Sequence, residues 1–184
     1  MNDLIQRLKQ LSNEKISTPD IETHLIQSAV LIPIISVTDP RLILTKRTDH
    51  LPSHTGQISL PGGTHEIADK TLLDTALRET HEEIGLHKDK INIIAELEKV
   101  STLSNYAITP YLGLIEETPI LKVNANEVAQ IINAPLSHFL DITNYSEAWI
   151  KRNNKKIRVY KINFEEHLIW GATAKILYQL AELT

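Results

Sequence analysis

The sequence predicts one α/β or α+β domain built around a mixed β-sheet. Along the 184 residues, apolar and β-branched segments that favour strands are interleaved with segments whose apolar residues have helical spacing. A hydrophobic fraction of 42% is enough for a real core. No internal repeat, low-complexity segment or linker divides the chain. We therefore expect a single domain over residues 1–184, with an N-terminal helix and link at 1–20.

The first half of the chain is expected to form two helices and three strands. Leu4, Ile5 and Leu8 have the spacing of an amphipathic helix. Gly85 should end the second helix, and the turn residues Pro61-Gly62-Gly63 should stop the strand before them. In chain order, the expected elements are a helix at 3–12, a polar link at 12–20, strands at 24–37 and 41–47, a polar loop at 48–56, a strand at 57–60 and a helix at 71–86.

The second half is expected to alternate strands with two more helices. Segment 156–164 has apolar residues on both faces, which indicates either a bulge or a strand buried on both sides. The expected elements are strands at 91–100, 107–115, 127–132 and 156–164, and helices at 135–140 and 171–183.

Composition argues against several classes of function. The net charge of -4 gives no overall basic surface for nucleic acid. The chain has no cysteine, which excludes disulfides, zinc–thiolate sites and a thiol nucleophile. No apolar run approaches the roughly 20 residues that span a bilayer, and no signal peptide is recognisable. We expect a cytoplasmic protein that acts on a small molecule and binds neither membranes nor nucleic acid.

Three carboxylates crowd the helix expected at 71–86. Glu79, Glu82 and Glu83 occupy positions i, i+3 and i+4, which share one side of an α-helix. Because like charges at this spacing repel, a cation is expected among them. Oxygen ligands suit Mg²⁺ or Mn²⁺, ions that neutralise phosphate groups. A solvated acidic face is an alternative of equal weight on spacing alone, and the glycine turn upstream favours the metal site.

The other residues of this helix have separate roles. Leu73, Leu77 and Ile84 lie nearly opposite the glutamates, so they are expected to anchor the helix in the core. Arg78 precedes Glu82 by four residues and is expected to orient that carboxylate. His81 projects to a different side.

The segment 61–86 resembles the signature of the Nudix hydrolases. The resemblance rests on Pro61-Gly62-Gly63, on Asp69 and on the run from Arg78 to Leu86. Three departures stand out. The first acidic residue is Asp69, eight residues rather than seven separate it from Arg78, and Thr80 occupies the usual aliphatic position. The helix glutamates are intact, so metal binding is expected to be little affected.

A motif upstream of this segment narrows the resemblance. Residues 44–47 and 56–63 are similar to the motif that precedes the Nudix box in coenzyme A pyrophosphatases, and the likeness extends over about residues 25–180. Leu60 stands where that subfamily usually has Phe, a mild change at a packing position. Pro52 stands where it usually has Arg, which removes one phosphate contact.

The resemblance implies an α/β/α sandwich around a mixed sheet, with metal-dependent hydrolysis of a pyrophosphate bond. For coenzyme A, the products are adenosine 3',5'-bisphosphate and 4'-phosphopantetheine. Another nucleotide substrate, such as ADP-ribose, a dinucleotide or an oxidised nucleotide, is the second hypothesis. A non-catalytic ligand-sensing module is the third. The oligomeric state is left open, with a homodimer as one option.

Catalysis is expected to depend on the helix residues. Glu79, Glu82 and Glu83 would hold Mg²⁺ or Mn²⁺, and one of them would also take a proton from the attacking water. Arg78 would orient them. Glu127 is a weaker candidate for the general base, and its simplest interpretation is an ordinary exposed glutamate.

Substrate binding is expected upstream of the helix. Lys46 and Arg47 could hold phosphates, with Arg47 favoured and an exposed strand end equally consistent with Lys46. Gly62 and Gly63 could bring backbone N–H groups to phosphate, although a tight turn is the simpler role. Zinc binding by His50 and His54 is disfavoured, because Pro52 between them indicates a loop. Tyr160 and Trp170 could stack on an adenine, although burial is the simpler interpretation for Trp170.

Overall fold

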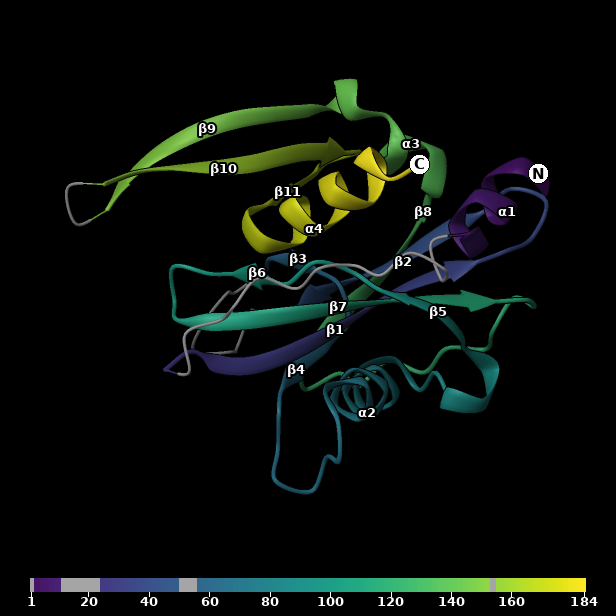
Figure 1. The fold of residues 1–184 in the computed structure, drawn as a ribbon. Helices are drawn as coiled ribbons and strands as arrows, with labels where there is room; N and C mark the ends of the chain where they lie inside the picture. Colours follow the sequence, from purple (N-terminus) through teal and green to yellow (C-terminus); the bar gives the residue numbers. More distant parts are fainter. Residues whose placement is uncertain (1, 11–23, 50–55, 153–154) are drawn as a thin grey trace.

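The computed structural model describes residues 2–10, 24–49, 56–152 and 155–184 (Figure 1). The expected link at 12–20 lies outside these residues. Pro52 and the pair His50 and His54 also lie outside them, so the interpretations made for these three residues stay predictions.

The chain forms two sheets, four α-helices and two short 3-10 helices within the described residues. The strands are β1 (Ile26–Ile35), β2 (Arg41–Arg47), β3 (Ile58–Ser59), β4 (Gly62–Thr64), β5 (Asn92–Glu96), β6 (Val100–Ser101), β7 (Tyr106–Ile115), β8 (Val128–Pro135), β9 (Tyr145–Arg152), β10 (Lys155–Phe164) and β11 (His167–Trp170). The helices are α1 (Asn2–Gln10), α2 (Leu72–Ile84), η2 (Lys88–Lys90), α3 (Leu136–Leu140), η3 (Ile142–Asn144) and α4 (Gly171–Glu182).

The central sheet is mixed and has eight strands. Its main path runs β3-β2-β1-β7-β5, while β4 pairs with β1, β6 with β7 and β8 with β2. β1 and β7 are parallel, and the other pairs are antiparallel. Both parallel strands are apolar and buried along most of their length, as expected for strands covered on both faces.

Alternate residues of β1 enter two separate cores. Ala29 and Leu31 pack on the side of α2, whereas Ile32 and Ile34 pack on the side of α1 and α4. The second core is the larger and includes Tyr160 and Ile162 from the second sheet, β11-β10-β9. Figure 1 shows α2 on one side of the central sheet, with α4 and the second sheet on the other. The predicted α/β architecture around a mixed sheet is therefore confirmed.

Several predicted elements are confirmed closely. The strand predicted at 41–47 is β2, and the helix predicted at 71–86 is α2, which ends at Gly85. The segment predicted at 91–100 is instead divided into β5 and β6. Gly62 and Gly63 were expected to lie in a turn that stops a strand, but they form β4 and pair with β1. Glycine permits this pairing because a Cβ on Gly62 would lie 2.3 Å from the carbonyl oxygen of Ala29.

The second sheet was only partly expected. β9 and β11 were not predicted, because β9 mixes charged with apolar residues and β11 has only four residues. In β10, Tyr160 and Ile162 are buried in the larger core, while Ile157 and Val159 are half-buried on the other face. The described pairs between β9 and β10 continue without a register shift, so the alternative of a bulge is wrong for this part of β10.

None of the helices in the described part of the chain is both long and apolar enough to cross a membrane.

Candidate functional site

Helix α2 is fixed at both ends by its own sequence. Thr71 is the N-cap: its hydroxyl accepts from the N–H of Asp74 at 3.1 Å, while the Asp74 carboxylate accepts from the N–H of Thr71 at 2.9 Å. Gly85 ends the helix with a left-handed φ of 70°, and its N–H donates to the carbonyl of His81. These caps define the two ends of the helix that carries the glutamates.

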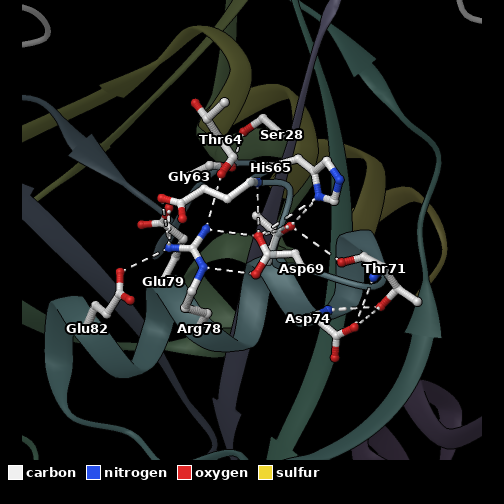
Figure 2. A network of polar contacts seen from close by, with 12 residues as sticks. Ser28, Gly63, Thr64, His65, Asp69, Thr71, Asp74, Arg78, Glu79 and Glu82 are labelled. Carbon is white, nitrogen blue, oxygen red and sulfur yellow. Dashed lines mark hydrogen bonds and ion pairs between the residues drawn. The ribbon is translucent and has the colours of Figure 1, made fainter.

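Arg78 joins the acidic residues of the site (Figure 2). Its Nε and Nη2 donate to the two carboxylate oxygens of Asp69 at 3.0 Å each. Nη1 donates at 3.0 Å to both Glu79 and Glu82. Nη2 also reaches the carbonyl of Thr64 at 3.2 Å. The predicted brace on Glu82 is present, and Arg78 holds three carboxylates rather than one.

Asp69 holds Arg78 and closes the loop before α2. Its side chain is only 5% exposed and also accepts from the N–H of Glu66 at 3.1 Å and from the hydroxyl of Thr75 at 2.9 Å. The hydrogen bond from Arg78, with the other donors, holds the pKa of Asp69 well below its usual range. The same pair raises the pKa of the Arg78 guanidinium. Asp69 is therefore a positioning residue.

Glu83 is the buried carboxylate of the site. It is 3% exposed, and its Oε2 has no hydrogen-bond partner among the described residues. Burial, followed by the charge of Glu79, raises the pKa of Glu83 to about 8, although Arg47 and a hydrogen bond from the Gly62 backbone oppose the shift. Burial also raises the pKa of Glu79. The prediction that Glu83 lies on the face opposite the core is wrong, because the central sheet covers this residue.

Gly63 leaves room for the carboxylate of Glu79. A Cβ on Gly63 would lie 2.4 Å from both Cδ and Oε1 of Glu79, much closer than any van der Waals contact. Gly63 is held in β4 by pairing with Ala29 and by the hydroxyl of Ser28, which donates to its carbonyl at 2.6 Å. The Gly62 backbone instead supports the carboxylate of Glu83. Both glycines thus pack directly against the acidic helix.

Glu127 is a further carboxylate close to the helix glutamates. Its charge contributes to the raised pKa values of both Glu79 and Glu83, so it lies close enough to interact with both. Asn124 orients it by donating to Glu127 Oε1 at 3.3 Å, and the Glu127 carbonyl accepts from the N–H of Thr48 at 3.0 Å. The interpretation of Glu127 as an ordinary exposed glutamate missed this proximity. The candidacy of Glu127 as a general base was predicted, and the pairing of β2 with β8 gives its position.

Lys46 and Arg47 are the last two residues of β2, and the register with β8 shifts between them. The charge of Arg47 acts on Glu83, which places Arg47 near the acidic helix. Its buried Nε has no hydrogen-bond partner within the described structure. Of the two cations, Arg47 is the one whose charge acts on the buried glutamate.

The remaining candidates lie apart from these carboxylates. Tyr160 stacks on Tyr178 with ring centroids 4.3 Å apart, on the far side of the central sheet. Trp170 is 42% exposed, so the expectation that it is buried is wrong. His81 is exposed and contacts the ring of His87 edge-on.

The donors in this cluster suit a hard divalent cation. Across the described ranges, no three His, Cys, Asp or Glu side chains are gathered closely enough to hold a metal ion as they stand. Glu79 and Glu82 each give one oxygen to Arg78, whereas Glu83 keeps a buried oxygen uncommitted. An uncommitted buried carboxylate oxygen beside other carboxylates fits Mg²⁺ or Mn²⁺ better than a soft ion.

Known proteins resemble this chain in sequence and in fold. The model of the NUDIX domain matches residues 26–150. A protein from Photorhabdus laumondii subsp. laumondii named "Uncharacterized Nudix hydrolase NudL" is 39% identical over 183 residues, which cover 99% of this chain and 96% of the relative.

Two solved structures resemble the fold at low sequence identity. A MutT/nudix family protein from Enterococcus faecalis has a TM-score of 0.55 at 14% identity, with 98% of this chain and 69% of that chain covered. An Ap4A hydrolase from C. elegans has a TM-score of 0.51 at 17% identity, with 60% of this chain and 80% of that chain covered. By its sequence match over most of its length, supported by its architecture, the chain belongs to the Nudix hydrolase family.

Proposed function

We propose that this Nudix hydrolase cleaves the pyrophosphate bond of coenzyme A or one of its derivatives. The products would be adenosine 3',5'-bisphosphate and 4'-phosphopantetheine. The single observation that supports a hydrolytic site most strongly is the uncommitted, buried Oε2 of Glu83 among neighbouring carboxylates. The choice of coenzyme A rests on the motif at 44–47 and 56–63.

Nudix hydrolases generally use divalent metal ions, and we assign Glu79, Glu82 and Glu83 as the residues that hold Mg²⁺ or Mn²⁺ here. A divalent ion held there would supply positive charge to offset the negative charge of the phosphoanhydride and would lower the pKa of a bound water. Glu83 contributes from a buried position. Glu82 is 49% exposed at the side chain and contributes from the rim.

The chain's own cations position these groups and the substrate. Arg78 orients Glu79 and Glu82, and Asp69 fixes Arg78 through two parallel hydrogen bonds. Arg47, whose charge acts on Glu83, is proposed to contact a substrate phosphate through its guanidinium. Lys46 has a weaker case, because Arg47, and not Lys46, is among the charges that shift the pKa of Glu83.

A carboxylate must accept the proton of the attacking water. We propose that one of the helix glutamates combines this role with metal binding. Glu127 is the second candidate, supported by its interaction with Glu79 and Glu83. Glu127→Gln distinguishes them. If Glu127 is the base, kcat falls while the metal concentration needed for half-maximal activity stays unchanged.

A substrate screen with product identification by mass tests the proposal. Coenzyme A, its oxidised form, an acyl thioester, ADP-ribose and a dinucleoside polyphosphate are compared in Mg²⁺ and in Mn²⁺. We expect the highest kcat/KM for coenzyme A or a derivative, with adenosine 3',5'-bisphosphate as product. A preference for ADP-ribose or a dinucleotide would reject the coenzyme A assignment and keep the hydrolase.

Glutamine substitutions test the site itself. Glu82→Gln and Glu83→Gln should each lower kcat/KM by ~100-fold or more while the fold persists, because each removes a metal-binding charge. Glu116→Gln is the matched control, since it neutralises an exposed carboxylate just beyond β7. Full activity in both site variants would contradict the assignment.

A further inference from the structure

Strand β9 forms an open edge of the second sheet. In the order β11-β10-β9, the described residues of β9 pair with β10 alone (Figure 1). The strand has eight residues, and Trp149 near its centre is 63% exposed. Glu147 and Lys151 on either side of Trp149 are exposed as well. An exposed edge of this length presents unpaired backbone groups to which another strand can bond.

The sequence of β9 is complementary to itself in the antiparallel direction. If Trp149 lies opposite Trp149 of a second copy, Glu147 lies opposite Lys151, and Lys151 opposite Glu147. On the other face, Ala148 lies opposite Ile150. Opposite charges and apolar pairs directly across a strand pair both stabilise it.

Other registers lose this match. Residues directly opposite each other in an antiparallel pair point to the same face of the sheet. If one β9 strand shifted by one residue, the opposed side chains would point to opposite faces, so this register is excluded. A shift of two residues would place Glu147 or Lys151 opposite Trp149, so neither charge would meet its opposite. Lysine commonly protects edge strands from pairing. Here Lys151 instead has an acidic counterpart at the symmetric position.

We propose that β9 binds β9 of a second copy of this chain about a two-fold axis at Trp149. The two second sheets would then form one continuous sheet of six strands, three from each copy. Glu147 would contact two cations, because Arg158 of its own chain already donates to it at 3.2 Å. This interface is independent of the hydrolytic site on α2.

Charge reversal tests the register. Glu147→Lys and Lys151→Glu each replace two attractive cross-strand pairs with two repulsive ones. Each should therefore weaken dimerisation by at least about tenfold, as measured by sedimentation velocity over a range of concentrations. An equimolar mixture of the two variants should form heterodimers, and the double variant should again form homodimers, because opposite charges face each other in both cases. Far-UV circular dichroism checks that each variant is folded.

A single cysteine tests the axis, because the chain has none of its own. Residues directly opposite in antiparallel strands have Cα atoms ~4.5–5.5 Å apart, a distance that a disulfide spans. Trp149→Cys should therefore crosslink to its own copy on mild oxidation. Ala148→Cys, the matched control, should crosslink efficiently only when mixed with Ile150→Cys.

Three results would overturn the proposal. The wild-type protein could remain monomeric at all concentrations. A dimer could persist in both charge variants with no crosslink at Trp149→Cys, which would place its interface elsewhere. Finally, β9 could capture a strand of a different protein while the isolated chain stays monomeric.

Discussion

At the level of single residues, the carboxylate of Glu83 is buried at an energetic cost that metal binding would remove. Burial and the charge of Glu79 raise its pKa to about 8. An ordinary glutamate has a pKa of about 4.3, so the folded state favours the protonated form. Such a group lowers stability when it is ionised, and a bound cation reverses that effect. We infer that the proposed role in metal binding, rather than stability, explains a glutamate at this position.

Glu83→Gln should therefore stabilise the protein when no divalent ion is present. The penalty is absent below the unfolded pKa of about 4.3, grows as pH rises, and is complete above the folded pKa of about 8. At pH 9 we expect the free energy of unfolding of the variant to exceed that of the wild type by ~1 kcal/mol or more. Urea unfolding in chelator across this pH range measures the difference.

Mg²⁺ or Mn²⁺ should then stabilise the wild type more than the variant, since binding to the native state alone raises its stability. A variant that is less stable than the wild type at pH 9 would contradict this account of Glu83.

At the level of elements, β4 and α2 form one unit whose close contact depends on glycine. Gly63 lies against the carboxylate of Glu79, and Thr71 and Gly85 set the two ends of the helix. Capping sets the two ends of α2. The absence of a side chain at Gly63 allows β4 to lie close to the carboxylate of Glu79. The order strand, loop, helix is readable from the sequence, but this contact is not.

Gly63→Ala should displace the carboxylate of Glu79 while it leaves the fold largely intact. The added methyl would lie 2.4 Å from Cδ of Glu79, at the end of a flexible side chain. We expect kcat/KM to fall by about tenfold or more, and the metal concentration for half-maximal activity to rise. Steady-state kinetics with a metal titration measures both. Wild-type kinetics in Gly63→Ala would show that Glu79 does not need its present position.

At the level of the whole molecule, the domain extends beyond the part that matches the family model. That match ends at residue 150, whereas β10, β11 and α4 supply buried side chains to the larger core. These include Ile162, Ile169, Ile176, Leu177 and Leu180. The family-matched part is therefore not a complete folding unit in this chain.

Removal of residues 151–184 should abolish cooperative folding, because it exposes one face of the central sheet. We expect a chain that binds a hydrophobic dye and shows no sharp thermal transition in near-UV circular dichroism. Removal of residues 1–10 is the control. This truncation deletes α1 and with it Leu8, which packs in the same core. It should lower the melting temperature, but unfolding should remain cooperative. Cooperative unfolding of the larger truncation would show that the second sheet and α4 are dispensable.

The sequence by itself determined the features that depend on local chemistry. The end of α2 at Gly85, the spacing of Glu79, Glu82 and Glu83, and the strand at 41–47 all follow from patterns within a few residues. The resemblance of segment 61–86 to the Nudix signature predicted the protein family. These are the parts of the fold and of the site in which propensity and pattern agree.

Only the tertiary structure decided which of these groups are buried and which meet. It buried Glu83 under the sheet, brought Glu127 to the same carboxylates through the pairing of β2 with β8, and left β9 as an open edge. The physical reason is that desolvation and charge–charge interaction depend on neighbours distant in sequence. A helical period specifies the side of the helix on which a carboxylate lies, but not what covers that side.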